Sequence, residues 1–95
     1  MRPNQREFDE RPAALAAIFV NIGRRLRIEI ADGDSVTLKL KDVSVIIHQV
    51  VSTGASRYRG TIAGFENWLG PTCKGYAIGE KVDFTERQVF VCTMG

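Results

Sequence analysis

The sequence has no long apolar run, one histidine, two cysteines and little excess charge. A membrane-spanning helix needs roughly 20 consecutive apolar residues, and none of the 95 residues belongs to such a stretch. Residues 13–22 have the length of a short signal core, but Asp9 and Glu10 precede them and no export-type cleavage site is clear. We therefore expect a cytoplasmic protein that does not enter the membrane.

The scarcity of histidine and cysteine narrows the chemistry that the chain can perform. His48, Cys73 and Cys92 lack the close ligand spacing of a zinc site. Two cysteines in a chain with a proper core predict free thiols rather than a disulfide framework. A Cys–His nucleophile pair also needs an orienting group, and the carboxylates are scattered over turns and strand faces. We expect no metal, no cofactor and no catalysis.

The net charge is only +2, which sets no strong preference for a partner. A dedicated nucleic-acid binder usually has a larger and more clustered basic excess. With 44% hydrophobic and 25% charged residues the composition is that of an ordinary globular protein, and the length fits one domain. We expect residues 1–11 to be a flexible tail and residues 12–95 a single β-rich domain.

Alternating apolar residues predict that the domain is organised around three consecutive strands. Residues 24–30 and 35–41 each alternate with a period of two, which is typical of strands with one buried face. Asp32-Gly33-Asp34 lies between them and has the composition of a turn. A three-residue loop pairs Ile30 with Val36, so the two apolar sets share one face.

The third strand, residues 43–51, is apolar on both sides. This pattern predicts cover on both faces, one by the sheet interior and the other by an N-terminal helix, a curled-over strand or a partner chain. Further strands are expected at residues 57–65, 80–84 and 88–92. Glycines within the first of these indicate a bulge, a bend or a close backbone approach.

A helix is expected in front of the strands, from Pro12 to Ile22. Pro12 suits the first turn of a helix, and Gly23 follows as a stop signal. Apolar residues recur between them with helical spacing, at Leu15, Ile18, Phe19 and Ile22. The predicted fold is therefore mainly β (α+β): a single small antiparallel β-barrel or curled sheet with one N-terminal helix.

Residues 22–33, Ile-Gly-Arg-Arg-Leu-Arg-Ile-Glu-Ile-Ala-Asp-Gly, followed by Val36 and Leu40, resemble the first half of Sm-like proteins. The resemblance covers about a third of the chain. It implies a strongly bent five-stranded barrel and, in that family, RNA binding by a ring oligomer. Where the family carries an aspartate and an asparagine in its RNA-contacting loop, this chain has Ser44 and His48.

The C-terminal half resembles the YegJ-like family of small bacterial proteins. The shared pattern is Tyr58-Arg59-Gly60, then residues 78–84 (Ile-Gly-Glu-Lys-Val-Asp-Phe), then Val89-Phe90. This resemblance implies no particular activity, so both resemblances concern the fold more than the function.

Two candidate binding surfaces stand out. The first is a set of basic residues on strands, and in the hairpin register above Arg27 lies opposite Lys39 and Arg25 opposite Lys41. Like charges directly opposed are unfavourable, unless acidic neighbours or an anionic partner relieve them. The second is the long Gly/Pro-rich loop at residues 66–79, whose aromatics form either an exposed patch or a plug for the barrel. The candidate binding residues are Arg25, Arg27, Lys39, Lys41, Arg57, Arg59, Trp68 and Tyr76.

We therefore expect a non-catalytic binding module that engages another protein, as an inhibitor or a regulator. The alternative is an Sm-like or SH3-like barrel that binds nucleic acid through the basic strand face. An enzyme built on His48 and a cysteine is a more distant alternative. A homo-oligomer is compatible with the sequence, and so is a phage-encoded inhibitor.

Overall fold

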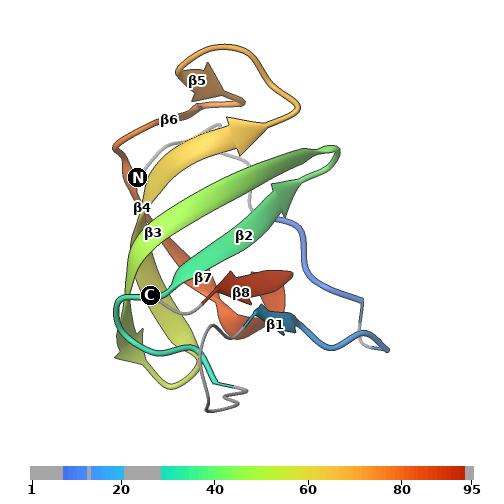
Figure 1. The fold of residues 1–95 in the computed structure, drawn as a ribbon, viewed down its shortest axis with the longest axis vertical. Helices are drawn as coiled ribbons and strands as arrows, with labels where there is room; N and C mark the ends of the chain where they lie inside the picture. The colour runs from blue at the N-terminus through green and yellow to red at the C-terminus, as the bar shows by residue number, and fades with distance from the viewer. Residues whose placement is uncertain (1–7, 13, 21–28, 94–95) are drawn as a thin grey trace.

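The computed structural model describes residues 8–12, 14–20 and 29–93. Within them the strands are β1 (Ile18–Val20), β2 (Ser35–Leu40), β3 (Val43–Gly54), β4 (Arg57–Glu66), β5 (Thr72–Cys73), β6 (Tyr76–Ala77), β7 (Lys81–Thr85) and β8 (Val91–Thr93), with a 3-10 turn, η1 (Glu86–Gln88), before β8. Six of the strands form one sheet in the order β1-β8-β2-β3-β4-β7, and β5 and β6 form a separate hairpin (Figure 1). The prediction of a mainly β domain is confirmed.

The strands in the middle of the sheet have regularly alternating apolar and polar residues. In β2 the apolar residues Val36, Leu38 and Leu40 are buried, while the residues between them are only partly buried. β2, β3, β4 and β7 pair antiparallel in sequence order. The strands expected at residues 35–41, 43–51, 57–65 and 80–84 are therefore present, because a period of two places one apolar face on the core. The strand expected at residues 88–92 is instead the shorter β8, which begins at Val91 after η1.

The sheet bends around a single core but does not close into a barrel (Figure 1). Val82 and Phe84 of β7 belong to the same buried cluster as Leu38 and Leu40 of β2. Within the described residues, β1 and β7 remain the two ends of the sheet and do not pair with each other. The predicted closed barrel is therefore wrong, and the curled sheet describes the fold.

The predicted N-terminal helix is also wrong, because residues 18–20 form strand β1, parallel to β8. Leu15 and Ile18 are mostly exposed, so the stripe with helical spacing does not face a core. An isolated helix of this length is marginal in water. Ile18, Phe19 and Val20 are β-branched or aromatic and favour extended backbone, and the parallel ladder with β8 pairs alternate backbone groups of the segment, beginning with the Ile18 N–H. Ala13 and residues 21–22 lie outside the described residues.

The predicted first hairpin is wrong at the one residue pair that the structure describes. Val36 pairs with Ile47 of β3 on one side and with Cys92 of β8 on the other. No side of β2 therefore remains for Ile30, which lies in an irregular segment and packs against the core. The rest of that predicted strand, residues 24–28, lies outside the described residues.

A β-bulge explains why β3 is apolar on both sides. Its register with β4 shifts between His48 and Val51, and Gln49 has a positive φ of 56°. The extra residue reverses the alternation, so Val50 is buried while Val51 is exposed. The expected cover on the second face is only partial, because Ile46 on that face is half-buried.

Close packing of β4 on β3 explains Gly60. A side chain at this position would overlap the Cγ2 methyl of Ile47 and would lie 3.1 Å from the His48 carbonyl oxygen. Gly64 has open space instead. The two strand glycines therefore differ, because only Gly60 is required by close approach of the neighbouring strand.

Residues 8–12, here called the N-terminal strap, pack on the domain rather than forming a loose tail. Phe8 is buried and stacks on Tyr76 with ring centroids 4.8 Å apart. The Asp9 N–H donates to the Lys39 carbonyl oxygen (2.8 Å), and the Arg11 N–H donates to the Arg87 carbonyl oxygen (2.7 Å). The predicted boundary at residue 12 is therefore too late, since the strap belongs to the domain.

Candidate binding site

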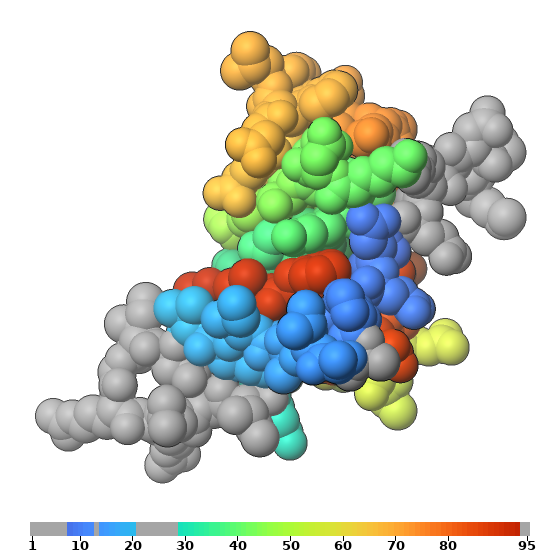
Figure 2. Space-filling view, turned by 90° about the vertical axis from the view of Figure 1, so that its right-hand side faces the viewer, coloured from blue at the N-terminus to red at the C-terminus, as the bar shows by residue number. Residues whose placement is uncertain are grey.

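Residues 67–78, here called the apolar loop, project beyond the end of the sheet between β4 and β7 (Figures 1 and 2). Leu69 is 97% exposed, and Trp68 and Ile78 are 44% and 49% exposed. A folded chain rarely holds three large apolar side chains in water within one short loop unless they have a use. The apolar loop is therefore the leading candidate for a binding site.

Internal hydrogen bonds hold the apolar loop in shape. The Trp68 indole Nε1 donates to the Thr72 carbonyl oxygen at 2.6 Å, and the Ile78 N–H donates to the Pro71 carbonyl oxygen at 2.9 Å. β5 and β6 pair across a turn in which Lys74 and Gly75 have positive φ. The loop thus has a defined conformation despite its glycines.

The base of the loop is fixed to the core by side chains that point inward. Cys73 is buried and Tyr76 is 1% exposed. Tyr76 therefore belongs to the core and not to a contact surface, which corrects its prediction as a binding residue. Trp68 is outside the buried core cluster, so its position favours the exposed patch over the plug.

Leu69 and Ile78 were missed as candidate residues. Sequence reasoning favoured aromatic residues because they are common at binding hot spots. The available signal was the position of Leu69, which stands beside Gly70-Pro71 with no alternating apolar neighbours. When no strand or helix periodicity includes a large aliphatic residue, the sequence gives no reason to expect that its side chain is buried in the core.

Charged side chains of both signs surround the apolar loop. Lys41 and Asp42 form the β2–β3 turn, Glu66 ends β4 beside Ser44, and Lys74 lies in the loop itself. Two further carboxylates contact this set: Glu80 accepts a hydrogen bond from the Ala77 N–H of the loop, and Asp9 accepts one from the Lys41 N–H. The rim is therefore polar with no excess of basic side chains, which gives little attraction for a polyanion.

The four basic candidate residues that the structure describes do not gather into one face. Lys39 pairs with Ser44 of β3 and Arg59 with Val51. At about 3.3 Å per residue these positions lie roughly 20 Å apart along β3. Lys41 and Arg57 extend the two groups further in opposite directions. Arg25 and Arg27 lie outside the described residues.

Two of these basic side chains, Lys39 and Arg59, interact with neighbouring residues of the protein. The Lys39 ammonium lies 4.9 Å from the centre of the Phe90 ring. Arg59 forms an ion pair with Asp83 across β4 and β7, with Nε and Oδ1 2.8 Å apart. The hydrogen bond and the negative charge of Asp83 raise the pKa of Arg59 above its usual value. Its charge is thus already matched within the protein, although the pair is exposed and adds little stability.

The lone histidine and the thiols lie in different environments. His48 is exposed on β3, a strand in the interior of the sheet. Cys73 and Cys92 are free and buried, and the Cys92 thiol donates to the buried Asp34 carboxylate at 3.3 Å. The described residues also contain no group of three potential metal-ligating side chains.

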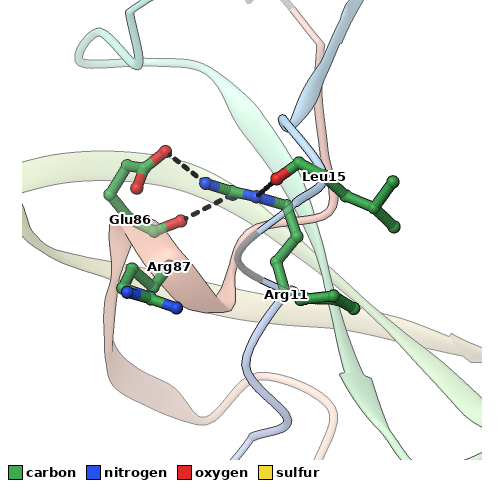
Figure 3. A pocket seen from close by; sticks show the side chains of 5 residues that line it. Arg11, Leu15, Glu86 and Arg87 are labelled. Carbon is green, nitrogen blue, oxygen red and sulfur yellow. Dashed lines mark hydrogen bonds and ion pairs between the residues drawn. The ribbon is translucent and has the colours of Figure 1, made fainter.

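A shallow pocket of about 270 Å³ lies where the strap meets η1 (Figure 3). Arg11 fills one side of it, and its guanidinium donates to the carbonyl oxygens of Leu15, Glu86 and Val89. Nη2 also pairs with the Glu86 carboxylate at 2.9 Å. Since these bonds use most of its donors, Arg11 holds the strap in place rather than offering a site to a ligand.

Comparisons of the chain with known protein families, curated proteins and solved structures found no match. The Sm-like and YegJ-like resemblances therefore remain predictions. In the part of the chain that the structure describes, no helix has the length and apolar character needed to cross a membrane.

Proposed function

We propose that this protein is a non-catalytic binding module that inserts its apolar loop into an apolar pocket of another protein. The observation that carries the proposal is Leu69, which is almost fully exposed beside the half-exposed Trp68. Removing a large aliphatic side chain from water contributes favourable free energy to binding, and tryptophan is a frequent anchor at the centre of interfaces. By occupying that pocket, the module acts as an inhibitor or a regulator of its partner.

Pre-organisation supports this proposal. The bonds from Trp68 to Thr72 and from Ile78 to Pro71 fix the loop before any partner arrives. Ordering a free loop on binding opposes association, and a loop that is already ordered avoids most of that free-energy cost. A glycine-rich segment without such bonds would be a poor anchor.

Charge favours a protein over a nucleic acid as the partner. The rim of the apolar loop has no excess of basic side chains, and Arg59 is matched by Asp83. Nucleic-acid affinity depends on several unmatched cations that replace counterions on phosphates. The two described basic groups, at Lys39–Lys41 and Arg57–Arg59, lie far apart on the sheet.

The test uses photo-crosslinking in the cell that produces the protein. A photoreactive amino acid placed at position 69 should form a covalent adduct with a single partner, and the same probe at position 51 should not. Val51 is a matched control because it is an exposed apolar residue on the sheet, outside the loop. The captured protein is then purified and its affinity is measured directly.

The affinity measurement compares the wild type with Leu69→Asp and Val51→Asp. We expect a loss of at least about tenfold for Leu69→Asp, because it places a charge in an apolar contact, and little change for Val51→Asp. Wild-type affinity should vary little with salt. Binding of Leu69→Asp with wild-type affinity would overturn the proposal. A steep fall of wild-type affinity with salt would also overturn it and would favour the nucleic-acid alternative.

A further inference from the structure

The two edges of the six-stranded sheet are protected very differently. On β7 the outward residues are Lys81, Asp83 and Thr85, and charge on an edge strand discourages pairing with another chain. β1 forms the opposite edge, and in the sequence it lies within a run of twelve uncharged residues from Pro12 to Gly23. Such an edge accepts a further strand without repulsion.

Within the described residues, β1 has one backbone donor and one backbone acceptor without a partner strand at its centre. The Ile18 N–H donates to the Phe90 carbonyl oxygen at 2.9 Å, in a parallel ladder with β8. In such a ladder alternate residues direct both backbone groups to the partner. The N–H and C=O of Phe19, the next residue, therefore point away from β8, and within the described residues no strand pairs with that side.

The side chains of β1 are also suited to a second strand. Phe19 packs against the core. Ile18 and Val20 alternate with it, and they are 63% and 44% exposed. Their outer face has no charge, so a partner strand that placed an apolar residue beside each of them would remove both from water.

We propose that β1 pairs antiparallel with β1 of a second copy of this chain, about a twofold axis at Phe19. Phe19 then exchanges two hydrogen bonds with Phe19 of the second copy, which satisfies both outward backbone groups. In this register Ile18 lies opposite Val20 of the second copy, and Val20 opposite its Ile18. The edge is thus complementary to itself, which is what a symmetric dimer requires. This inference is independent of the proposed function.

The dimer is weak because β1 is short. A three-residue strand buries far less than the roughly 800 Å² per partner of a standard interface. We therefore expect association only at high micromolar to millimolar concentration. The pairing joins two sheets edge to edge and leaves the apolar loop exposed, since the loop lies at the opposite end of the molecule from β1 (Figure 1).

Sedimentation equilibrium between about 20 µM and about 2 mM tests the dimer by mass action. The wild type should move from monomer to dimer. Val20→Lys should stay monomeric, because it places like charges near the twofold axis. Val51→Lys is the matched control, since Val51 is 43% exposed and lies on β3 away from the edge. A wild type that stays monomeric, or a Val51→Lys variant that loses association equally, would overturn the proposal.

Disulfide trapping tests the register. Ile18→Cys and Val20→Cys variants, mixed under mild oxidation, should cross-link to each other, because directly opposed residues of this kind have Cα atoms about 4.5 Å apart. Each variant alone should cross-link poorly, since diagonal neighbours lie about 7–8 Å apart. The native thiols are buried, so the wild type gives the background. A mixture no faster than the single variants would refute the register.

Discussion

The N-terminal strap and the apolar loop are both irregular segments held by hydrogen bonds, yet they direct their apolar side chains in opposite directions. The strap buries Phe8 against Tyr76, whereas the apolar loop leaves Leu69 in water. Both segments have fixed backbones, so the difference does not lie in order. The two segments differ in whether other residues of the domain cover the apolar side chain.

This comparison assigns different roles to the two segments. Burial of a large aromatic side chain supplies free energy to the fold, so the strap stabilises the domain. An exposed apolar side chain does not stabilise the fold. Its burial contributes favourable free energy only when a partner covers it, so the apolar loop contributes to binding instead. Substitutions in the two segments should therefore separate stability from affinity.

The largest effect is expected at the centre of the strap. Phe8→Ala removes a buried ring and should lower the free energy of unfolding by about 3–4 kcal/mol. Urea denaturation measures the loss, and Phe8→Leu should lose less because it leaves a smaller cavity. A change under about 1 kcal/mol would show that the strap does not contribute to the core.

The second effect concerns the bonds that hold the strap. Arg11→Met keeps much of the side-chain volume but removes the guanidinium donor to the Val89 carbonyl oxygen and one of the two donors to the Glu86 carbonyl oxygen. We expect a loss of about 2 kcal/mol in the free energy of unfolding. Arg11→Lys should restore part of it, because one ammonium cannot reproduce the fork of a guanidinium. Equal stability of all three proteins would contradict the anchoring role.

Trp68 should show an intermediate result. Trp68→Ala removes a half-buried ring and the 2.6 Å bond to Thr72, so we expect a loss of about 1 kcal/mol in stability together with faster dissociation from the partner. Thermal denaturation and binding kinetics on the same variant check this. A loss as large as that of Phe8→Ala, with unchanged dissociation, would identify Trp68 as a plug.

Leu69 should show the smallest effect on stability. Leu69→Ser changes a side chain that is almost fully in water, so the free energy of unfolding should stay within about 0.5 kcal/mol. Affinity for the partner should still fall by at least about tenfold. A marked loss of stability would mean that Leu69 packs within the domain, and the comparison between the two segments would fail.

The sequence predicted those parts of the fold that depend on local alternation. Val36, Leu38 and Leu40 have one buried face in any sheet, because the backbone period is two and water selects the apolar side. The same reasoning identified the segment of Trp68 as a candidate site, since an aromatic in a Gly/Pro-rich loop has no place in a regular element. These inferences need no knowledge of which strand lies beside which.

The sequence did not predict features that depend on distant neighbours. The spacing of Leu15, Ile18 and Phe19 fits a helix. Residues 18–20 instead form a strand, because they pair with β8 along its free side. The apolar residues on both sides of residues 43–51 are compatible with cover on both faces as well as with a bulge, and only the pairing with β4 shows the register shift before Val51. Each feature is a choice between conformations of similar local free energy, so distant neighbours decide it.

The contrast between Tyr76 and Leu69 has the same origin. By composition both are large side chains of one Gly/Pro-rich loop, and the sequence identifies that loop as unusual. Only the tertiary structure decides that Phe8, almost seventy residues away along the chain, covers Tyr76 while nothing described covers Leu69. Local sequence fixes which side chains avoid water, but the pairing of distant segments decides which of them find cover.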